Sequence, residues 1–341
     1  MRVVKGHGTE NDFVLIPDLE GALTLTPSLV AAICDRHAGL GADGVLRVVR
    51  CAAEPAAASM AADAEWFMDY RNADGSVAEM CGNGIRVFAR WLVDAGLAAP
   101  GDLPIATRAG VLTVRLGTVG DVSVDMGRAA MPTELADLKV AVADGPAAGR
   151  QVAAVGVLMP NPHAVAFVAD LADAGRLLAP PAVTPARAFP TGVNVEFVVR
   201  RGPRHVALRV HERGVGETRS CGTGAAAVMV AAARRDDEAP PTSYVVNVPG
   251  GRLLVAARRR PRRDDWSRGP GRRGRPAEGV GRGPPLSRLT RPTHRSRVDR
   301  RSELSQAVEQ LGGGGGRRPA RQRVLSIWNR IWCTALYPND G

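Results

Sequence analysis

The sequence contains few cysteines and no long apolar run, and each shortage argues against a class of protein. Its five cysteines, at positions 34, 51, 81, 221 and 333, are odd in number and widely spaced. This is typical of neither a disulfide scaffold nor a metal site. The longest apolar run, residues 225–233, is much shorter than the roughly 20 residues that span a membrane. The first thirteen residues contain no apolar segment typical of a signal peptide. We therefore expect a cytoplasmic protein with reduced thiols, no metal and no membrane partner.

Lysine is scarcer still, because only Lys5 and Lys139 occur in the chain. The net charge of +11 therefore comes from arginine, and it is unevenly distributed. Residues 258–341 hold 21 arginines and 7 acidic residues, a net charge of +14, which leaves −3 for residues 1–257. The segment is rich in Arg, Gly and Pro but has neither the interleaved aromatics nor the repeats of many RNA-binding tails. We predict no nucleic-acid partner and interpret residues 258–341 as disordered or translated out of frame.

Two copies of a short motif stand out in the remaining sequence: Cys81-Gly-Asn-Gly84 and Cys221-Gly-Thr-Gly224. Each precedes a segment with helical periodicity. A cysteine at the start of a helix lies at the positive end of the helix dipole, which favours the thiolate. Glycines beside it allow backbone N–H groups to approach an anionic ligand. The pair of motifs predicts two thiols that face one substrate from opposite sides.

Residues 1–257 show the patterns of a sheet-rich α+β protein. Alternating apolar residues predict strands, among them residues 111–116, 122–126, 193–199 and 206–210, and helical spacing predicts helices over 27–37, 85–97 and 225–235. The two cysteine motifs lie about half of the patterned region apart. We predict two similar domains, residues 1–118 and 119–257. Each should be a curved, mostly antiparallel sheet around a central helix, with the active site in the cleft between them.

Paired thiols can remove a proton from an amino-acid α-carbon on one face and return one on the other. Many enzymes catalyse that reaction with pyridoxal phosphate bound to a lysine as a Schiff base. Neither of the two lysines in this chain lies in a segment that suggests such a site. A cofactor-free route needs a base, an acid on the opposite face, and dipoles directed at the developing charge. Two cysteines at two helix starts supply all three, so we expect no cofactor.

The chain resembles the diaminopimelate epimerases, which are cofactor-independent isomerases of lysine and peptidoglycan-precursor synthesis. The resemblance rests on seven segments that occur in family order: residues 5–13, 35–44, 71–76, 79–86, 161–163, 192–197 and 212–224. Glu10 stands where many members have glycine. The family normally ends with a further strand after the segment similar to residues 249–254, and nothing similar to that end follows here.

The resemblance implies that Cys81 and Cys221 are the acid/base pair and that His163 and Glu212 help to deprotonate them. It implies a small-molecule substrate, diaminopimelate, whose two amino-acid ends require many polar contacts, and a homodimer. Arg213 suits bidentate binding of a carboxylate. The substrate-binding set implied in this way is Asn11, Asn72, Gly82, Asn83, Asn161, Asn194, Glu212, Arg213, Gly222 and Thr223.

Two alternative functions remain at this point. A related cofactor-free racemase, similar to proline racemase, would also pair two cysteines. A non-catalytic redox or binding protein could instead join Cys81 and Cys221 in a switchable disulfide, although no Cys-x-x-Cys motif supports that interpretation. The many asparagines and the Glu212-Arg213 pair favour a long substrate with a second zwitterionic end.

Overall fold

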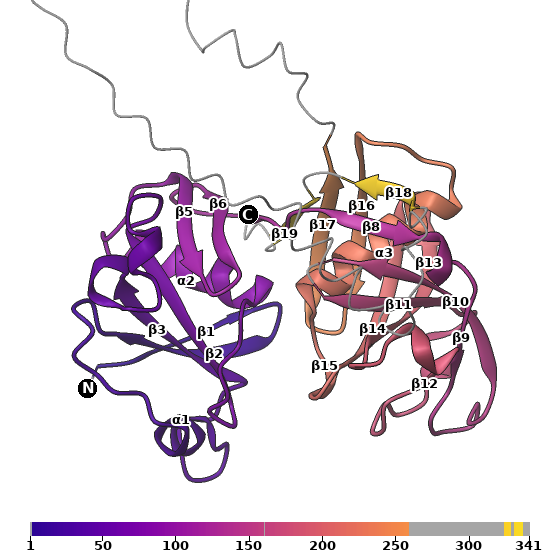
Figure 1. The fold of residues 1–341 in the computed structure, drawn as a ribbon, viewed down its shortest axis with the longest axis horizontal. Coiled ribbons are helices and arrows are strands. Elements are labelled where there is room, and N and C mark those ends of the chain that lie inside the picture. Colours follow the sequence, from indigo (N-terminus) through magenta and orange to yellow (C-terminus); the bar gives the residue numbers. More distant parts are fainter. Residues whose placement is uncertain (1, 160, 259–323, 329–330, 337–341) are drawn as a thin grey trace, which may run out of the picture.

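A computed structural model describes residues 2–159, 161–258, 324–328 and 331–336 (Figure 1). Two halves lie side by side, and in each half strands surround one long helix, α2 (Gly82–Asp94) or α3 (Gly222–Arg235). Residues 225–233 of α3 are all at most 3% exposed, which explains why that helix is apolar on every side. No helix in the described part of the chain is long and apolar enough to cross a membrane.

The first half contains seven strands and the helices α1 (Pro27–Cys34) and α2. Thr26 caps α1 by accepting a hydrogen bond from the N–H of Leu29, and Pro27 occupies the first turn, where its missing N–H costs nothing. The strands are β1 (Val4–Gly8), β2 (Asn11–Pro17), β3 (Gly44–Arg50), β4 (Trp66–Asn72), β5 (Gly101–Thr107), β6 (Gly110–Leu116) and β7 (Val122–Asp125).

The second half takes its strands from two distant parts of the chain. Most come from residues 129–257, and two come from residues 324–336. They are β8 (Ala129–Pro132), β9 (Leu138–Ala141), β10 (Gln151–Leu158), β11 (Pro162–Phe167), β12 (Ala182–Thr184), β13 (Asn194–Gly202), β14 (His205–Glu212), β15 (Gly216–Thr218), β16 (Thr242–Val248), β17 (Gly251–Ala257), β18 (Val324–Trp328) and β19 (Ile331–Leu336).

The two halves repeat one pattern of strand pairing. From β1 to β7, neighbouring strands pair antiparallel, parallel, antiparallel, parallel, antiparallel and antiparallel. The series β10, β11, β13, β14, β16, β17 and β19 shows the same succession. In each half the long helix follows the fourth strand of its series. The predicted α+β fold with two similar domains is confirmed.

The elements expected from the sequence also form, with some shifts in their ends. The segments over 110–116, 194–202 and 205–212 are strands as expected, and both long helices begin directly after a motif cysteine. Because β7 still pairs with β6, the chain crosses to the second half after Asp125 rather than after Thr118.

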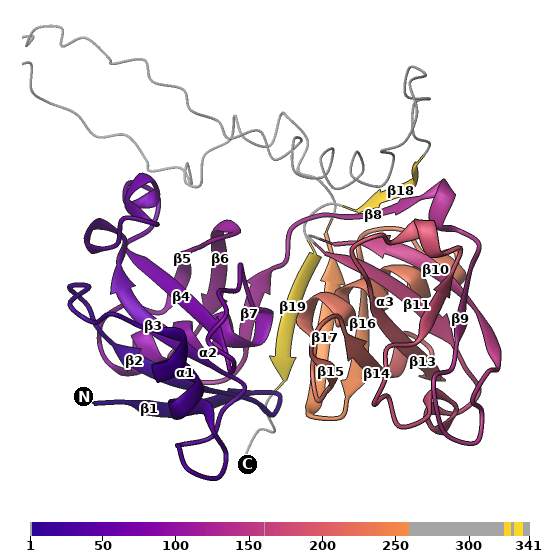
Figure 2. The same cartoon turned by 60° about the horizontal axis from the view of Figure 1, so that its bottom comes forward.

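The expectation that residues after 257 lie outside the fold is wrong for β18 and β19. β18 pairs with β8, and β19 lies between β17 of the second half and β7 of the first (Figure 2). β19 thereby occupies the place in its series that β7 occupies in the first, and the two strands pair with each other. Residues 259–323, which belong to the same prediction, lie outside the described residues.

Contacts of β19 show why this strand matters for stability. Trp332 is 5% exposed, and guanidinium groups of Arg115 and Arg258 lie 5.0 Å from the centre of its ring. The Ser123 and Thr334 hydroxyls hydrogen-bond at 2.7 Å across the junction. Without β19, the backbone edges of β7 and β17 would lose their partners.

We therefore expect truncation after Arg258 to lower the melting temperature of the protein. Loss of the buried Trp332 alone should cost about 3–5 kcal/mol of unfolding free energy. Thermal unfolding of the truncated and full-length chains measures the difference. A second truncation after Leu336 keeps β19 and serves as the control. Equal melting temperatures for all three chains would show that β19 does not contribute to the folded state.

Candidate active site

Cys81 and Cys221 occupy the same position on two equivalent helices. Each is the N-cap residue, in an extended conformation, and each sulfur accepts a hydrogen bond at 3.4 Å from the backbone N–H of the glycine three residues later. Gly84 and Gly224 are these donors. The cap therefore holds both thiols at the start of their helices, with the first-turn N–H groups beside them.

The starts of the two helices face each other at the junction between the halves. A Cβ atom on Gly222 would lie 3.4 Å from the Cα of Gly82, and one on Gly82 would lie 3.1 Å from the side chain of Met126. Larger residues at either position would therefore hold the helix starts further apart. The predicted juxtaposition of the two motifs is what the structure shows.

A network of side chains orients Asn11 beside Cys81. The Asn11 amide nitrogen donates to Asp43 at 2.7 Å, which leaves its Oδ1 facing the Cys81 sulfur at 3.6 Å. The amide of Asn83 donates to the same oxygen at 3.2 Å. Arg36 pairs in turn with Asp43, at 2.6 Å. Cys81 thus faces an oriented amide acceptor that charged groups behind it hold in place.

Cys221 faces hydroxyl and carboxyl groups instead of an amide. Its sulfur lies 3.4 Å from the hydroxyl of Thr223. Glu212, at the end of β14, accepts a hydrogen bond from Thr218. Burial raises the pKa of both thiols, and the charge of Glu212 raises each further, so this one carboxyl group acts on both helix starts.

The helix starts favour the thiolates, as predicted from the sequence, but burial has a larger and opposite effect. Burial raises the pKa of the Cys81 thiol to about 11, although the N–H of Gly84 acts in the opposite direction. Burial, Glu212 and Glu196 raise the pKa of Cys221 well above its ordinary value. Burial also raises the pKa of Glu212. Desolvation of the charged forms therefore outweighs the helix dipole, and both thiols are protonated at neutral pH.

His163 lies on β11 and is fully buried. Its Nδ1 lies 2.6 Å from Oε1 of Glu196, which is also fully buried, and its Nε2 lies 3.0 Å from Oδ1 of Asn161. The sequence prediction included His163 and Asn161 but not Glu196.

Asn83 and Ser220 connect the two halves next to the cysteines. The Asn83 amide donates to the carbonyl of Ser220 at 2.8 Å, and the hydroxyls of Thr9 and Ser220 hydrogen-bond at 2.6 Å. Glu10 forms an ion pair with Arg219 across the same junction. The side chain of Asn83 is occupied by these contacts and by Arg86, so only its backbone N–H is suited to the predicted binding role.

The remaining predicted binding residues lie at or next to strand ends: Asn72 ends β4, Asn194 begins β13, and Arg213 follows β14. The side chain of Asn72 donates to Ser76 at 3.0 Å, and that of Arg213 donates to the carbonyl of Thr191 at 3.2 Å. Asn194 accepts from the N–H of Arg213 at 2.8 Å, which ties the start of β13 to the end of β14.

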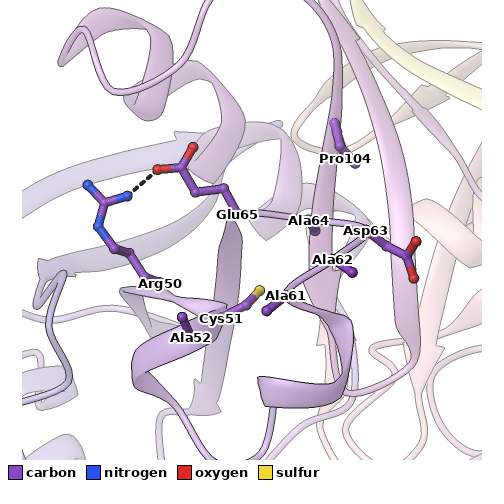
Figure 3. A pocket seen from close by; sticks show the side chains of 9 residues that line it. All are labelled: Arg50, Cys51, Ala52, Ala61, Ala62, Asp63, Ala64, Glu65 and Pro104. Carbon is purple, nitrogen blue, oxygen red and sulfur yellow. Dashed lines mark hydrogen bonds and ion pairs between the residues drawn. The ribbon is translucent and has the colours of Figure 1, made fainter. Parts of the chain in front are cut away.

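A hollow on the first half contains none of the candidate residues. Arg50, Cys51, Pro104 and residues 61–65 line it, and an Arg50–Glu65 ion pair lies at its rim (Figure 3). Burial raises the pKa of Cys51, so its thiol is a poor nucleophile. In the described part of the chain, no three His, Cys, Asp or Glu side chains gather in a way that could hold a metal ion.

Glu196 and Asp43 are the site residues that the sequence prediction missed. Glu196 stands in an otherwise apolar strand run, where a carboxylate is costly unless it has a partner. A carboxylate in an apolar strand is the feature of the sequence from which Glu196 could be predicted. Asp43 gave no comparable signal, because an aspartate beside a glycine is typical of turns.

Comparison with known proteins decides which group of cysteine-pair proteins this is. The family model described as diaminopimelate epimerase matches residues 3–132 and 155–266. The chain belongs to the diaminopimelate epimerase family. It is 66% identical over 224 residues to the diaminopimelate epimerase of Streptomyces coelicolor, covering 66% of this chain and 75% of that one. It is 52% identical over 231 residues to the enzyme of Thermobifida fusca, covering 67% and 81%. The resemblance seen in the sequence is confirmed, and the chain is an isomerase.

Solved structures of other proteins share the fold at low sequence identity. A probable proline racemase from Agrobacterium radiobacter aligns with a TM-score of 0.54 at 14% identity, covering 75% of this chain and 84% of that one. A phenazine biosynthesis protein of the PhzF family from Bacillus anthracis aligns with a TM-score of 0.51 at 16% identity, covering 76% and 91%. These matches show the fold alone, and membership of the diaminopimelate epimerase family rests on sequence.

Proposed function

We propose that this chain interconverts LL- and meso-diaminopimelate by a two-base mechanism, with Cys81 and Cys221 on opposite faces of one α-carbon. The observation that supports it is the pair of cysteine-capped helices whose starts meet at Gly82 and Gly222. One sulfur, as thiolate, removes the α-proton, and the other, as thiol, donates a proton to the opposite face. The two sulfurs have exchanged protonation states when the product leaves.

In this proposal Glu212 supplies the thiolate. Because burial raises the pKa of both thiols, neither is ionised at neutral pH without a base nearby. Glu212 acts on both thiols, and burial raises its own pKa. A higher pKa of the carboxyl group lies closer to the pKa of a thiol, which makes proton transfer from the thiol less unfavourable. Transfer of a proton from thiol to Glu212 leaves the site with no net change in charge. His163 and its partner Asn161 would lie beside the bound substrate.

The charge that develops on the substrate would be stabilised by backbone dipoles. The first-turn N–H groups at Gly82-Asn83 and Gly222-Thr223 lie at the positive ends of α2 and α3 and suit the α-carboxylate. Arg213 suits the carboxylate at the distant end of the substrate, and the amides of Asn11, Asn72 and Asn194 suit its ammonium and carboxylate groups. A long substrate with two zwitterionic ends would use all of these groups.

The test is solvent deuterium incorporation under reducing conditions. Incubated in D₂O with LL-diaminopimelate, the protein should produce the meso isomer with deuterium at one α-carbon. L-Proline should remain unchanged. A double variant, Cys81→Ala with Cys221→Ala, is the control. Turnover of proline in place of diaminopimelate, or no exchange with either, would overturn the proposal.

The family resemblance also supports a homodimer in the cytoplasm as the working form. The molar mass of the purified protein in solution, measured by light scattering, tests the dimer, and a monomeric mass at full activity would contradict it.

A further inference from the structure

The repeated strand pairing allows each residue of one half to be matched to a residue of the other. In the first half β2 pairs with β3 so that Phe13 faces Gly44 and Leu15 faces Leu46. In the second half β11 pairs with β13 so that His163 faces Asn194 and Val165 faces Glu196. β4 pairs with β3 in the same register as β14 pairs with β13, so the last residue of β4 is matched to the last residue of β14. The matched pairs are Cys81 with Cys221, Asn11 with Asn161, Phe13 with His163, Leu46 with Glu196, and Asn72 with Glu212.

These matched pairs reveal that the two thiols have different surroundings. The groups matched to His163, Glu196 and Glu212 are a phenyl ring, an isobutyl group and an amide, so the second half supplies titratable groups at three places where the first half has none. The charged groups of the first half that act near Cys81 are Arg86 and, behind Asn11, Asp43. The equivalent glycines Gly84 and Gly224 show the same difference between the two halves. A Cβ on Gly84 would lie 3.3 Å from the Leu46 side chain, whereas one on Gly224 would lie 2.8 Å from Oε1 of Glu196.

Gly224 also places Glu196 close to Cys221. The same Cβ position lies 3.4 Å from the Cys221 sulfur, so the carboxyl group of Glu196 and the thiol of Cys221 both lie beside Gly224. Only the missing side chain of glycine leaves room for both. The charged or titratable groups facing Cys221 are therefore Glu196 from β13, Glu212 from β14 and, beyond Glu196, His163 from β11.

His163 and Glu196 form a buried pair that connects β11 with β13. Nδ1 of His163 lies 2.6 Å from Oε1 of Glu196, and its Nε2 lies 3.0 Å from Oδ1 of Asn161. Both side chains are fully buried, and Oε2 of Glu196 has no hydrogen-bond partner. Glu196 therefore fixes the orientation of the His163 ring, while its carboxyl group lies close to Cys221.

We propose that Glu196 is a positioning residue that fixes the orientation of His163, and that its carboxyl group makes Cys221 chemically different from Cys81. The carboxylate oxygen that faces Cys221 opposes ionisation of this thiol. The hydrogen bond with His163 keeps the carboxylate from being an isolated buried charge, which would be far more costly. Cys221 is therefore the thiol that ionises less readily, and Cys81, with Phe13 and Leu46 in the matched places, ionises first. This order of ionisation rests on the proposed function, whereas the inequality of the thiols does not.

The electrostatics of the two thiols support this assignment. Glu196 contributes to the raised pKa of Cys221 but is not among the groups that raise the pKa of Cys81. The pKa of Cys81 rises only to about 11, because burial is its main cause and the contribution of Glu212 is smaller.

The experiment compares the alkylation of the two thiols in one protein. Full-length wild type and Glu196→Gln are treated with iodoacetamide across a range of pH, and the labelled Cys81 and Cys221 peptides are quantified by mass spectrometry. In Glu196→Gln the midpoint for Cys221 should fall by about one pH unit or more, since a like charge has been removed, while that for Cys81 stays in place. The kcat should nevertheless fall ~10–100-fold, as for other residues that orient a functional histidine. Glu196→Asp should bring the Cys221 midpoint and the kcat part of the way back to their wild-type values.

The matched position in the first half supplies the control. Leu46→Met changes a buried side chain at the equivalent place without changing charge, and it should leave both midpoints unchanged. A Glu196→Gln protein that melts like wild type but keeps the wild-type midpoint of Cys221 would overturn the proposal. These readouts need no substrate, so they remain informative even if the chain acts on another amino acid.

Discussion

Replacement of either Cys81 or Cys221 by alanine is expected to lower kcat for epimerisation by at least ~10²–10⁴-fold. A general acid or base typically contributes this much, and each thiol serves as the base in one direction and the acid in the other. Circular dichroism of the product, or chiral chromatography, measures the conversion. Near-normal epimerisation by either variant would contradict the two-base scheme.

Each single variant should still exchange one stereoisomer. The remaining thiol can remove a proton from its own face and return a deuteron to that face, so Cys81→Ala and Cys221→Ala should label opposite configurations in D₂O. Cys34→Ala and Cys51→Ala are the matched controls. Both thiols are buried outside the site, with pKa values raised by burial, so their loss should leave turnover nearly unchanged. Labelling of the same configuration by both site variants would place both thiols on one face.

Replacement of Glu212 by glutamine should lower kcat/KM near pH 7 by ~10²–10⁴-fold and change the shape of the pH profile. In the wild type, the acidic limb should lie above the ordinary carboxyl value of 4.5, because burial raises the pKa of Glu212. Without this carboxylate, a thiol must ionise unaided. Activity should then rise with pH through the alkaline range, toward the pKa of about 11 of Cys81.

Glu217→Gln is the control for this variant. Glu217 lies on β15, close in sequence, but its carboxylate pairs with Arg209 at 2.6 Å and is exposed, so its loss should leave the profile in place. If Glu212→Gln kept the wild-type acidic limb, another group would be the base.

The sequence predicts the parts of the site that depend on local structure. A cysteine followed by glycines and a helical segment predicts a helix with the cysteine at its N-cap. An N-cap needs a side-chain acceptor, and the glycines allow other groups to approach the first turn closely. That is why Cys81 and Cys221 stand where the motifs predict. Duplication of the motif also predicts two similar halves, since each central helix needs its own sheet.

Other features depend on contacts between distant segments and could not be predicted in this way. Whether a thiol ionises depends on burial against both halves, and that outweighs the helix dipole which the local sequence indicates. The partnership of His163 with Glu196 spans two strands whose pairing is parallel and nonlocal. β19 was missed because Arg- and Gly-rich residues precede it, and their composition conceals a short apolar segment at 331–336.

The place of β19 has a consequence for how the protein is made. Ser123 and Thr334, which hydrogen-bond across the junction, are 211 residues apart in the chain. During synthesis β7 therefore emerges long before its partner, and its edge stays open until residues 331–336 have been made. Such late, long-range pairing slows folding and leaves an exposed edge on which nascent chains can aggregate. Yield in cells should therefore depend on chaperones and on translation speed more than the stability of the finished protein would suggest.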